Sequence, residues 1–142
     1  MITPNQVRTA LYDLLKRELP DVVSVYTGVV PQRVPTYDDG AIKPYIGLWV
    51  SNSVGDQTMR GLDALSPMDA VRVRVQTQVV AATENDVYET ADLVTSLLTN
   101  APIGEGRVLP DAEQHATAMP LIDPTTTPHI PYLPLLWQLE TQ

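Results

Sequence analysis

The segment from Asp69 to Val80 constrains the fold more than any other part of the chain, because its residues alternate strictly in character. Successive side chains of a β-strand point to opposite faces, so alternation predicts a long strand in a sheet with one buried and one polar face. The polar face either lines the sheet surface or meets acidic residues of a neighbouring chain. The buried set is Val71, Val73, Val75, Thr77 and Val79, and the polar set is Arg72, Arg74, Gln76 and Gln78.

Helical patterns occur on both sides of this strand. Thr3 is a good N-cap before Pro4, Gln6 completes a capping box, and Pro20 should end the first helix. A second helix should begin after Thr83 and end near Asn100. Because it follows the strand after a short step, we expect it to fold straight back onto the sheet. Its acidic residues fall on the predicted exposed side: Glu84, Asp86, Glu89 and Asp92.

Further strands are predicted over residues 22–26 and 45–50, with shorter ones over 107–109 and 114–118. Residues 52–67 form a long connection, which is usually functional or flexible, and residues 100–128 are an irregular segment rich in Pro and Thr. We therefore expect residues 1–142 to form a single domain of the α+β class. In it, two helices pack on one face of a mixed, mainly antiparallel β-sheet with long loops.

The C-terminal segment is unusually apolar, with seven apolar residues among the ten from Ile130 to Leu139. Pro131 and Pro134 have opposite parity, so their missing N–H groups should point to opposite edges and exclude one regular edge strand. We predict an extended arm to about Pro134, followed by a strand from Leu135 to Glu140. Its side chains either bury on both faces within the chain or pack partly against a neighbouring subunit.

The charge of the 142-residue chain, −8 in total, is unevenly divided. Residues 1–74 hold eight basic and eight acidic residues, whereas residues 75–142 hold nine acidic residues and one basic residue, Arg107. This division indicates a two-sided surface if the halves fold onto different faces, or simply a solvated acidic face. The lack of clustered Lys and Arg disfavours tight, sequence-specific binding of duplex DNA.

Several function classes are excluded or disfavoured by composition. The chain has no cysteine, which excludes disulfides, a thiol nucleophile and cysteine-ligated zinc, and agrees with assembly in a reducing cytoplasm. No segment reaches the ~18 apolar residues of a membrane helix, and the first residues lack the layout of a signal peptide. Phosphate-binding loops and hydrolase motifs are absent, and neither His115 nor His129 has partners at a catalytic or metal-binding spacing. We expect no enzymatic activity, no metal and no cofactor.

Three segments carry a resemblance to a known family. They are the opening Met1–Pro4 with Val7–Leu11, the stretch Tyr26–Pro31, and the run from Val71 through Val87 into Ala91–Val94. Together with the order of the predicted elements, they resemble the tail-terminator proteins of long-tailed phages, particularly phages of actinobacteria. The similarity covers most of residues 1–100 and fades across residues 100–128.

The resemblance implies a structural protein of the virion, assembled in the host cytoplasm. Members of that family form a ring, usually hexameric, that caps the tail tube, stops its polymerisation and offers a surface to the head–tail connector protein. Genomic DNA passes through the ring. An acidic lumen would repel its phosphates, so we expect no sequence-specific contact with nucleic acid.

Two groups of residues are predicted to serve such an assembly. A loop facing the tube or the lumen would contain Asp56, Met59, Arg60 and Asp63, and a subunit interface would contain Arg72, Arg74, Tyr132, Leu136 and Trp137. The alternatives are another neck component of a phage, such as a head-closure protein or another tail component, or a small α+β enzyme or ligand-binding domain with an apolar pocket near Trp49 or Trp137.

Overall fold

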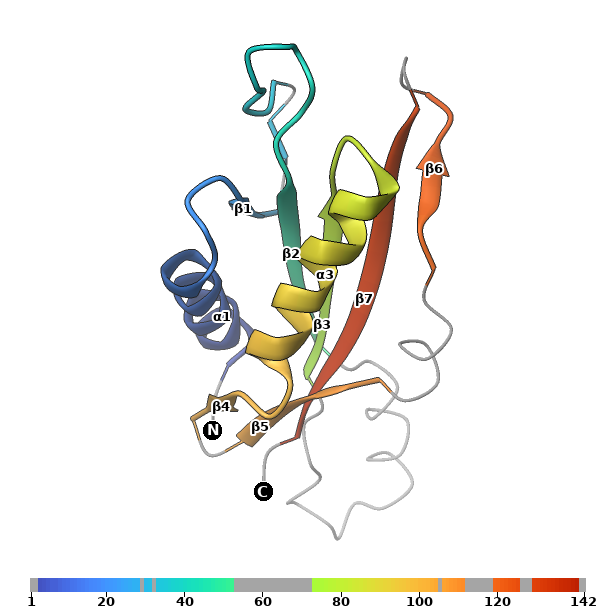
Figure 1. Ribbon diagram of the computed structural model, residues 1–142. Coiled ribbons are helices and arrows are strands. Elements are labelled where there is room, and N and C mark those ends of the chain that lie inside the picture. The colour runs from blue at the N-terminus through green and yellow to red at the C-terminus, as the bar shows by residue number, and fades with distance from the viewer. Residues whose placement is uncertain are drawn as a thin grey trace, which may run out of the picture.

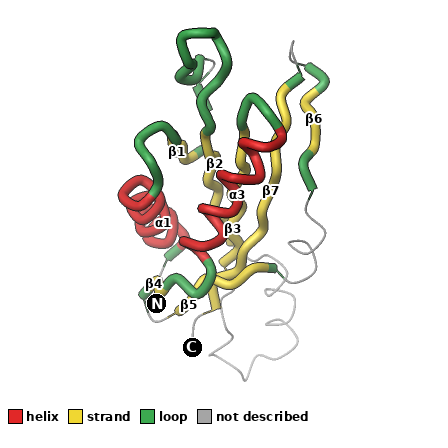
Figure 2. Tube along the Cα trace, viewed as in Figure 1, coloured by secondary structure: helices red, strands yellow, loops and turns green. Residues whose placement is uncertain are grey.

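The computed structural model describes residues 3–28, 30–31, 33–52, 73–104, 106–111, 119–125 and 129–140. In these ranges, the two helices lie side by side on one face of a β-sheet (Figure 1), and no described helix covers the other face (Figure 2). The predicted α+β class is thereby confirmed. We call the face without helices the open face.

Helix α1 (Pro4–Glu18) begins and ends where its sequence predicts. The Oγ1 atom of Thr3 accepts a hydrogen bond from the Gln6 N–H at 3.2 Å, and Oε1 of Gln6 accepts one from the Thr3 N–H at 2.9 Å. This reciprocal pair satisfies two N–H groups that have no partner within the helix. The buried stripe that packs on the sheet consists of Val7, Leu11 and Leu15.

Helix α3 (Glu84–Leu98) also matches its predicted bounds. Thr83 caps its start by accepting a hydrogen bond from the Asp86 N–H at 3.2 Å. Its end is followed by Asn100, whose φ of 63° lies in the left-handed region that asparagine tolerates. The helix folds back onto the strand before it, as expected, and buries Val87, Thr90, Ala91, Val94 and Leu98.

The sheet has seven strands among the described residues, in the order β1-β2-β3-β7-β5-β4, with β6 paired to the other end of β7. Strands β1 and β2 are parallel, and every other pair is antiparallel, so the sheet is mixed and mainly antiparallel as predicted. Strands β4 and β6 were not predicted, and the predicted strand over 114–118 lies outside the described residues. The bounds are β1 Ser24–Thr27, β2 Tyr45–Asn52, β3 Val73–Val80, β4 Pro102–Ile103, β5 Gly106–Pro110, β6 Leu121–Asp123 and β7 Ile130–Glu140.

The alternation in β3 matches the faces of the sheet. Val73, Val75, Thr77 and Val79 are buried beneath the helices, whereas Arg74 is exposed on the open face. Because β3 pairs along its whole length with β2 on one side and β7 on the other, it is the central strand around which the core is built.

The C-terminal segment differs from the prediction of an arm followed by a strand. β7 is one continuous strand of eleven residues that contains both Pro131 and Pro134. The carbonyl of Pro131 accepts a hydrogen bond from the Ala81 N–H, so the backbone N and C=O of Pro131 face β3. The carbonyl of Leu136 accepts a hydrogen bond from the Asp111 N–H, on the opposite edge of β7. The backbone N and C=O groups of the even-numbered residues, including Pro134, therefore face the edge where β5 and β6 pair. The prolines therefore do point to opposite edges, as the sequence implies.

Both prolines occupy positions where the ladder requires no N–H. Pro131 lies one residue beyond Tyr132, whose partner Val80 is the last residue of β3. Pro134 lies in the gap between β6, which pairs with residues 130–132, and β5, which pairs with residues 137–140. The predicted arm was wrong because the argument considered only a regular edge strand, whereas β7 lies between other strands that end or change beside each proline.

Candidate interaction surfaces

The open face carries the largest set of partly exposed side chains that share one surface of the sheet. The register places residues from β2, β3 and β7 beside one another in rows across the face. Aromatic, aliphatic and amide side chains are mixed in these rows, and most of them are half-buried. The rows are Tyr45–Val80–Tyr132, Gly47–Gln78–Pro134, Trp49–Gln76–Leu136 and Ser51–Arg74–Gln138.

On the open face, the ring of Trp49 lies across Gly47. A methyl group at position 47 would lie 2.5 Å from Cη2 of Trp49, well inside van der Waals contact. Glycine therefore lets the indole lie against the backbone, with 37% of Trp49 still exposed. The result is an aromatic surface in the middle of β2 that no described side chain covers fully.

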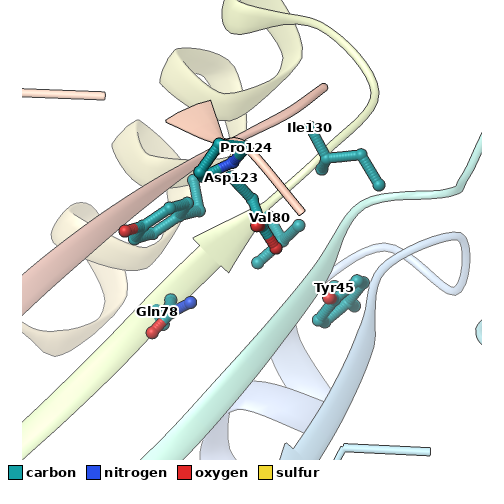
Figure 3. A pocket seen from close by; sticks show the side chains of 7 residues that line it. Tyr45, Gln78, Val80, Asp123, Pro124 and Ile130 are labelled. Atoms are coloured by element: carbon teal, nitrogen blue, oxygen red, sulfur yellow. The ribbon is translucent and has the colours of Figure 1, made fainter. Parts of the chain in front are cut away.

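A pocket of about 360 Å³ opens at one end of the open face, where β6 pairs with β7. Figure 3 shows Tyr45 from β2, Gln78 and Val80 from β3, and Asp123 from the end of β6 around this space. The remaining lining residues are Pro124, Ile130 and Tyr132. Two phenols, an amide and a carboxylate thus meet at one site that draws on four strands and the turn after β6.

The electrostatics of the pocket centre on Asp123. Its carboxylate accepts hydrogen bonds from the hydroxyl of Thr125 at 2.6 Å and from the Thr125 N–H at 2.9 Å. These bonds lower the pKa of Asp123, with a smaller contribution from His129, so the group is ionised at neutral pH. Burial raises the pKa of Tyr45, and electrostatic interactions with Asp123 and with the hydroxyl group of Tyr26 raise it further. Tyr26 packs edge-on against Tyr45, with ring centroids 5.8 Å apart.

Three of the residues predicted for a subunit interface share the open face. Arg74 is exposed there, and Tyr132 and Leu136 are half-buried. Trp137 is different, because it points to the helix side, is 1% exposed, and donates from Nε1 to Oγ1 of Thr77 at 3.0 Å. We correct its assignment: Trp137 belongs to the core of the chain and is not available to a neighbour. Arg72 and the predicted loop residues Asp56, Met59, Arg60 and Asp63 lie outside the described residues.

Three exposed apolar residues in and just before β6 were not expected from the sequence. Met119, Leu121 and Ile122 are 65%, 43% and 63% exposed, and Met119 and Ile122 have the highest exposures among the large hydrophobic residues described. The run Met119-Pro120-Leu121-Ile122 was a signal for a short strand, but it lies inside a segment that its Pro and Thr content marked as irregular. The residues of the pocket have no common spacing in the sequence, and only the sheet register brings them together.

Four of the nine acidic residues in the second half of the chain lie on α3: Glu84, Asp86, Glu89 and Asp92. Glu84, Glu89 and Asp92 are exposed on α3, as predicted, and the helix has no basic residue. The two halves do not form opposite faces. Helices α1 and α3 lie side by side on the same face of the sheet, and β4 from the second half contacts α1 (Figure 1).

Two features that would point to particular functions are absent from the described residues. In the described ranges, no three His, Asp or Glu residues are grouped so that they would hold a metal ion. No helix in the same ranges is long and apolar enough to cross a membrane. No protein-family model and no curated protein matches the chain. The case for a function therefore rests on the surfaces described above and on the sequence resemblance.

Proposed function

We propose that this chain is a structural assembly protein of a long-tailed phage, which forms a ring on the end of the tail tube, stops its polymerisation and provides the surface for head–tail joining. The resemblance of residues 1–100 to tail terminators is the source of the proposal. The observation that supports it best is the open face, where half-buried Tyr132 and Leu136 lie beside exposed Trp49 and Arg74. Such a mixture of apolar and polar groups is typical of contacts between proteins.

The distribution of charge is a second support. A closed ring is built from heterologous contacts, in which one surface of a subunit meets a different surface of the next. A molecule with one neutral side and one acidic side has two such surfaces. The part of the acidic side that the neighbour leaves uncovered, with Glu84, Glu89 and Asp92 on α3 as candidates, would repel the phosphates of DNA passing through the ring.

The oligomeric part of the proposal is tested by light scattering. The purified chain should have the mass of a ring, alone or after addition of tail-tube protein from the phage that encodes it. Leu136→Glu should prevent ring formation, because it places a charge on the half-buried part of the open face. Thr9→Glu, on the exposed side of α1, is the matched control and should leave the ring intact. A monomer under both conditions, or a ring unaffected by Leu136→Glu, contradicts this use of the open face.

The terminating activity is tested by electron microscopy of tubes that polymerise in vitro. Adding the chain should shorten the tubes, with rings at one end. Tubes of unchanged length, with the chain bound to the head–tail connector protein instead, would favour another neck component such as a head-closure protein. Tail-tube and tape-measure genes beside the gene for this chain are expected if it is a terminator.

A further inference from the structure

We propose that the pocket at the β6 end of the open face binds the basic side chain of an arginine or lysine presented by a partner protein. The inference is independent of the ring and of the tail, because it depends only on the residues that form the pocket. Among the described residues, the lining provides a carboxylate, an amide and two tyrosine rings, and no basic side chain.

The carboxylate gives the pocket its charge preference. Asp123 is ionised at neutral pH, and its two hydrogen bonds with Thr125 fix its orientation at the pocket wall. A guanidinium or ammonium group is the complement of such a carboxylate, and hydrogen bonds between charged partners are the strong ones. The amide oxygen of Gln78, which projects from the neighbouring β3, is a second acceptor for the same donor.

The tyrosines favour a cation over a polar neutral group. Tyr45 and Tyr132 are partners of Val80 on its two sides, so their rings stand on either side of the pocket floor. The faces of aromatic rings attract cations, more strongly where water is partly excluded. Tyr45 is half-buried, and the volume of about 360 Å³ falls at the lower end of the range of ligand pockets, roughly 300–1,000 Å³.

The surroundings indicate that the cation is part of a protein. The pocket is continuous with the open face, because the next rows carry Gln78 with Pro134 and Trp49 with Leu136. A side chain that enters the pocket therefore brings its backbone over a surface of half-buried apolar and amide groups. A protein chain matches that surface, whereas a free small cation would leave it uncovered.

The proposal is tested with two peptides that differ only in charge: acetyl-Gly-Arg-Gly-amide and the same peptide with citrulline in place of arginine. Each is titrated into the protein at pH 8.0 in low salt, with the ring signals of its six tyrosines followed by NMR. The arginine peptide should shift the signals of Tyr45 and Tyr132 in a saturable way. Tyr37 and Tyr88, exposed elsewhere, should not respond. The citrulline peptide should give no saturable shift.

Two variants establish the role of the pocket. Asp123→Asn should raise the Kd of the arginine peptide about tenfold or more, because a charge-assisted contact is lost. Asp92→Asn on α3 removes the same charge elsewhere and should have no effect. Gln78→Lys places a competing ammonium at the pocket and should abolish binding, which keeps the test decisive if Asp123→Asn disturbs the turn. The proposal is overturned by no saturable shift in the wild type, by equal binding of the citrulline peptide, or by wild-type affinity in Gln78→Lys.

Discussion

At the residue scale, the core contains a buried polar contact between Thr77 and Trp137. Thr77 is a buried polar residue on a strand face that otherwise consists of valines. Its hydroxyl oxygen accepts a hydrogen bond from the indole N–H of Trp137. The alternating pattern predicts that Thr77, a β-branched residue, is buried in the core, and the structure confirms this. The pattern does not reveal that its hydroxyl has a partner sixty residues further along the chain.

Removing that hydroxyl should destabilise the fold. Thr77→Val keeps the shape of the side chain but takes away the acceptor of the Trp137 N–H, so the free energy of unfolding should fall by about 1–3 kcal/mol. Urea denaturation followed by tryptophan fluorescence measures the change. Thr77→Ser is the matched control, since it keeps the hydroxyl and loses one methyl group, and it should cost about 1 kcal/mol or less. Equal stability of Thr77→Val and wild type would show that the contact contributes nothing.

The ionisation of Tyr45 should respond to Asp123. A nearby negative charge disfavours the phenolate, so Asp123→Asn should lower the pKa of Tyr45. The pKa should stay above the ordinary tyrosine value, because burial is the largest cause of the rise and the substitution leaves it in place. An NMR titration of the Tyr45 ring carbons through alkaline pH measures both effects, with Asp92→Asn as the control. An unchanged or higher pKa in Asp123→Asn would place Asp123 too far from the phenol to act.

At the element scale, the two helices show local signals that determine the structure directly. The cap residues Thr3 and Thr83 form the hydrogen bonds that their positions predict. Thr83→Ala should lower the free energy of unfolding by about 1 kcal/mol, since the Asp86 N–H loses its acceptor at the start of α3. Thr83→Ser should retain the stability of the wild type. The midpoints of urea unfolding of the wild type and the two variants measure this effect. An unchanged midpoint in Thr83→Ala would mean that water replaces the capping hydroxyl.

The sheet was predictable only where local pattern and final environment agree. β2, β3 and β5 were recognised because their apolar content or alternation matches their buried faces. The continuity of β7 was not predicted, because whether its prolines interrupt the strand depends on where β3, β5 and β6 end. No local pattern encodes those ends. β4 and β6 have two and three residues, too few for a periodic signal. The pocket could not be predicted from local patterns either, because Tyr45, Gln78 and Asp123 come together only through the pairing of strands that are distant in the sequence.

At the scale of the whole molecule, the sheet places the neutral and acidic halves of the chain side by side instead of back to back. The first half contributes α1, β1 and β2, and the second contributes most of β3, then α3 and the strands that follow. In a ring of such subunits, the open face would contribute to the contact between neighbours, and the neutral side of one subunit would lie next to the acidic side of the next. Asn52 and Val73, the residues that flank the connection between β2 and β3, are paired neighbours near the junction of the two halves.

Under the proposed function, the connection between β2 and β3 is expected to control tail length. Deleting Met59–Leu65 should leave the fold intact, since the pairing of β2 with β3 fixes both ends of the connection and the remaining residues far exceed the two that a hairpin turn needs. Under the proposed function, the same deletion should yield tails of uncontrolled length. Circular dichroism and urea denaturation check the fold, and electron microscopy of a phage carrying the deletion measures the tails. Replacing Met59–Leu65 with seven Gly and Ser residues separates the role of its side chains from that of loop length. Tails of normal length in both variants would remove this segment from the terminating surface.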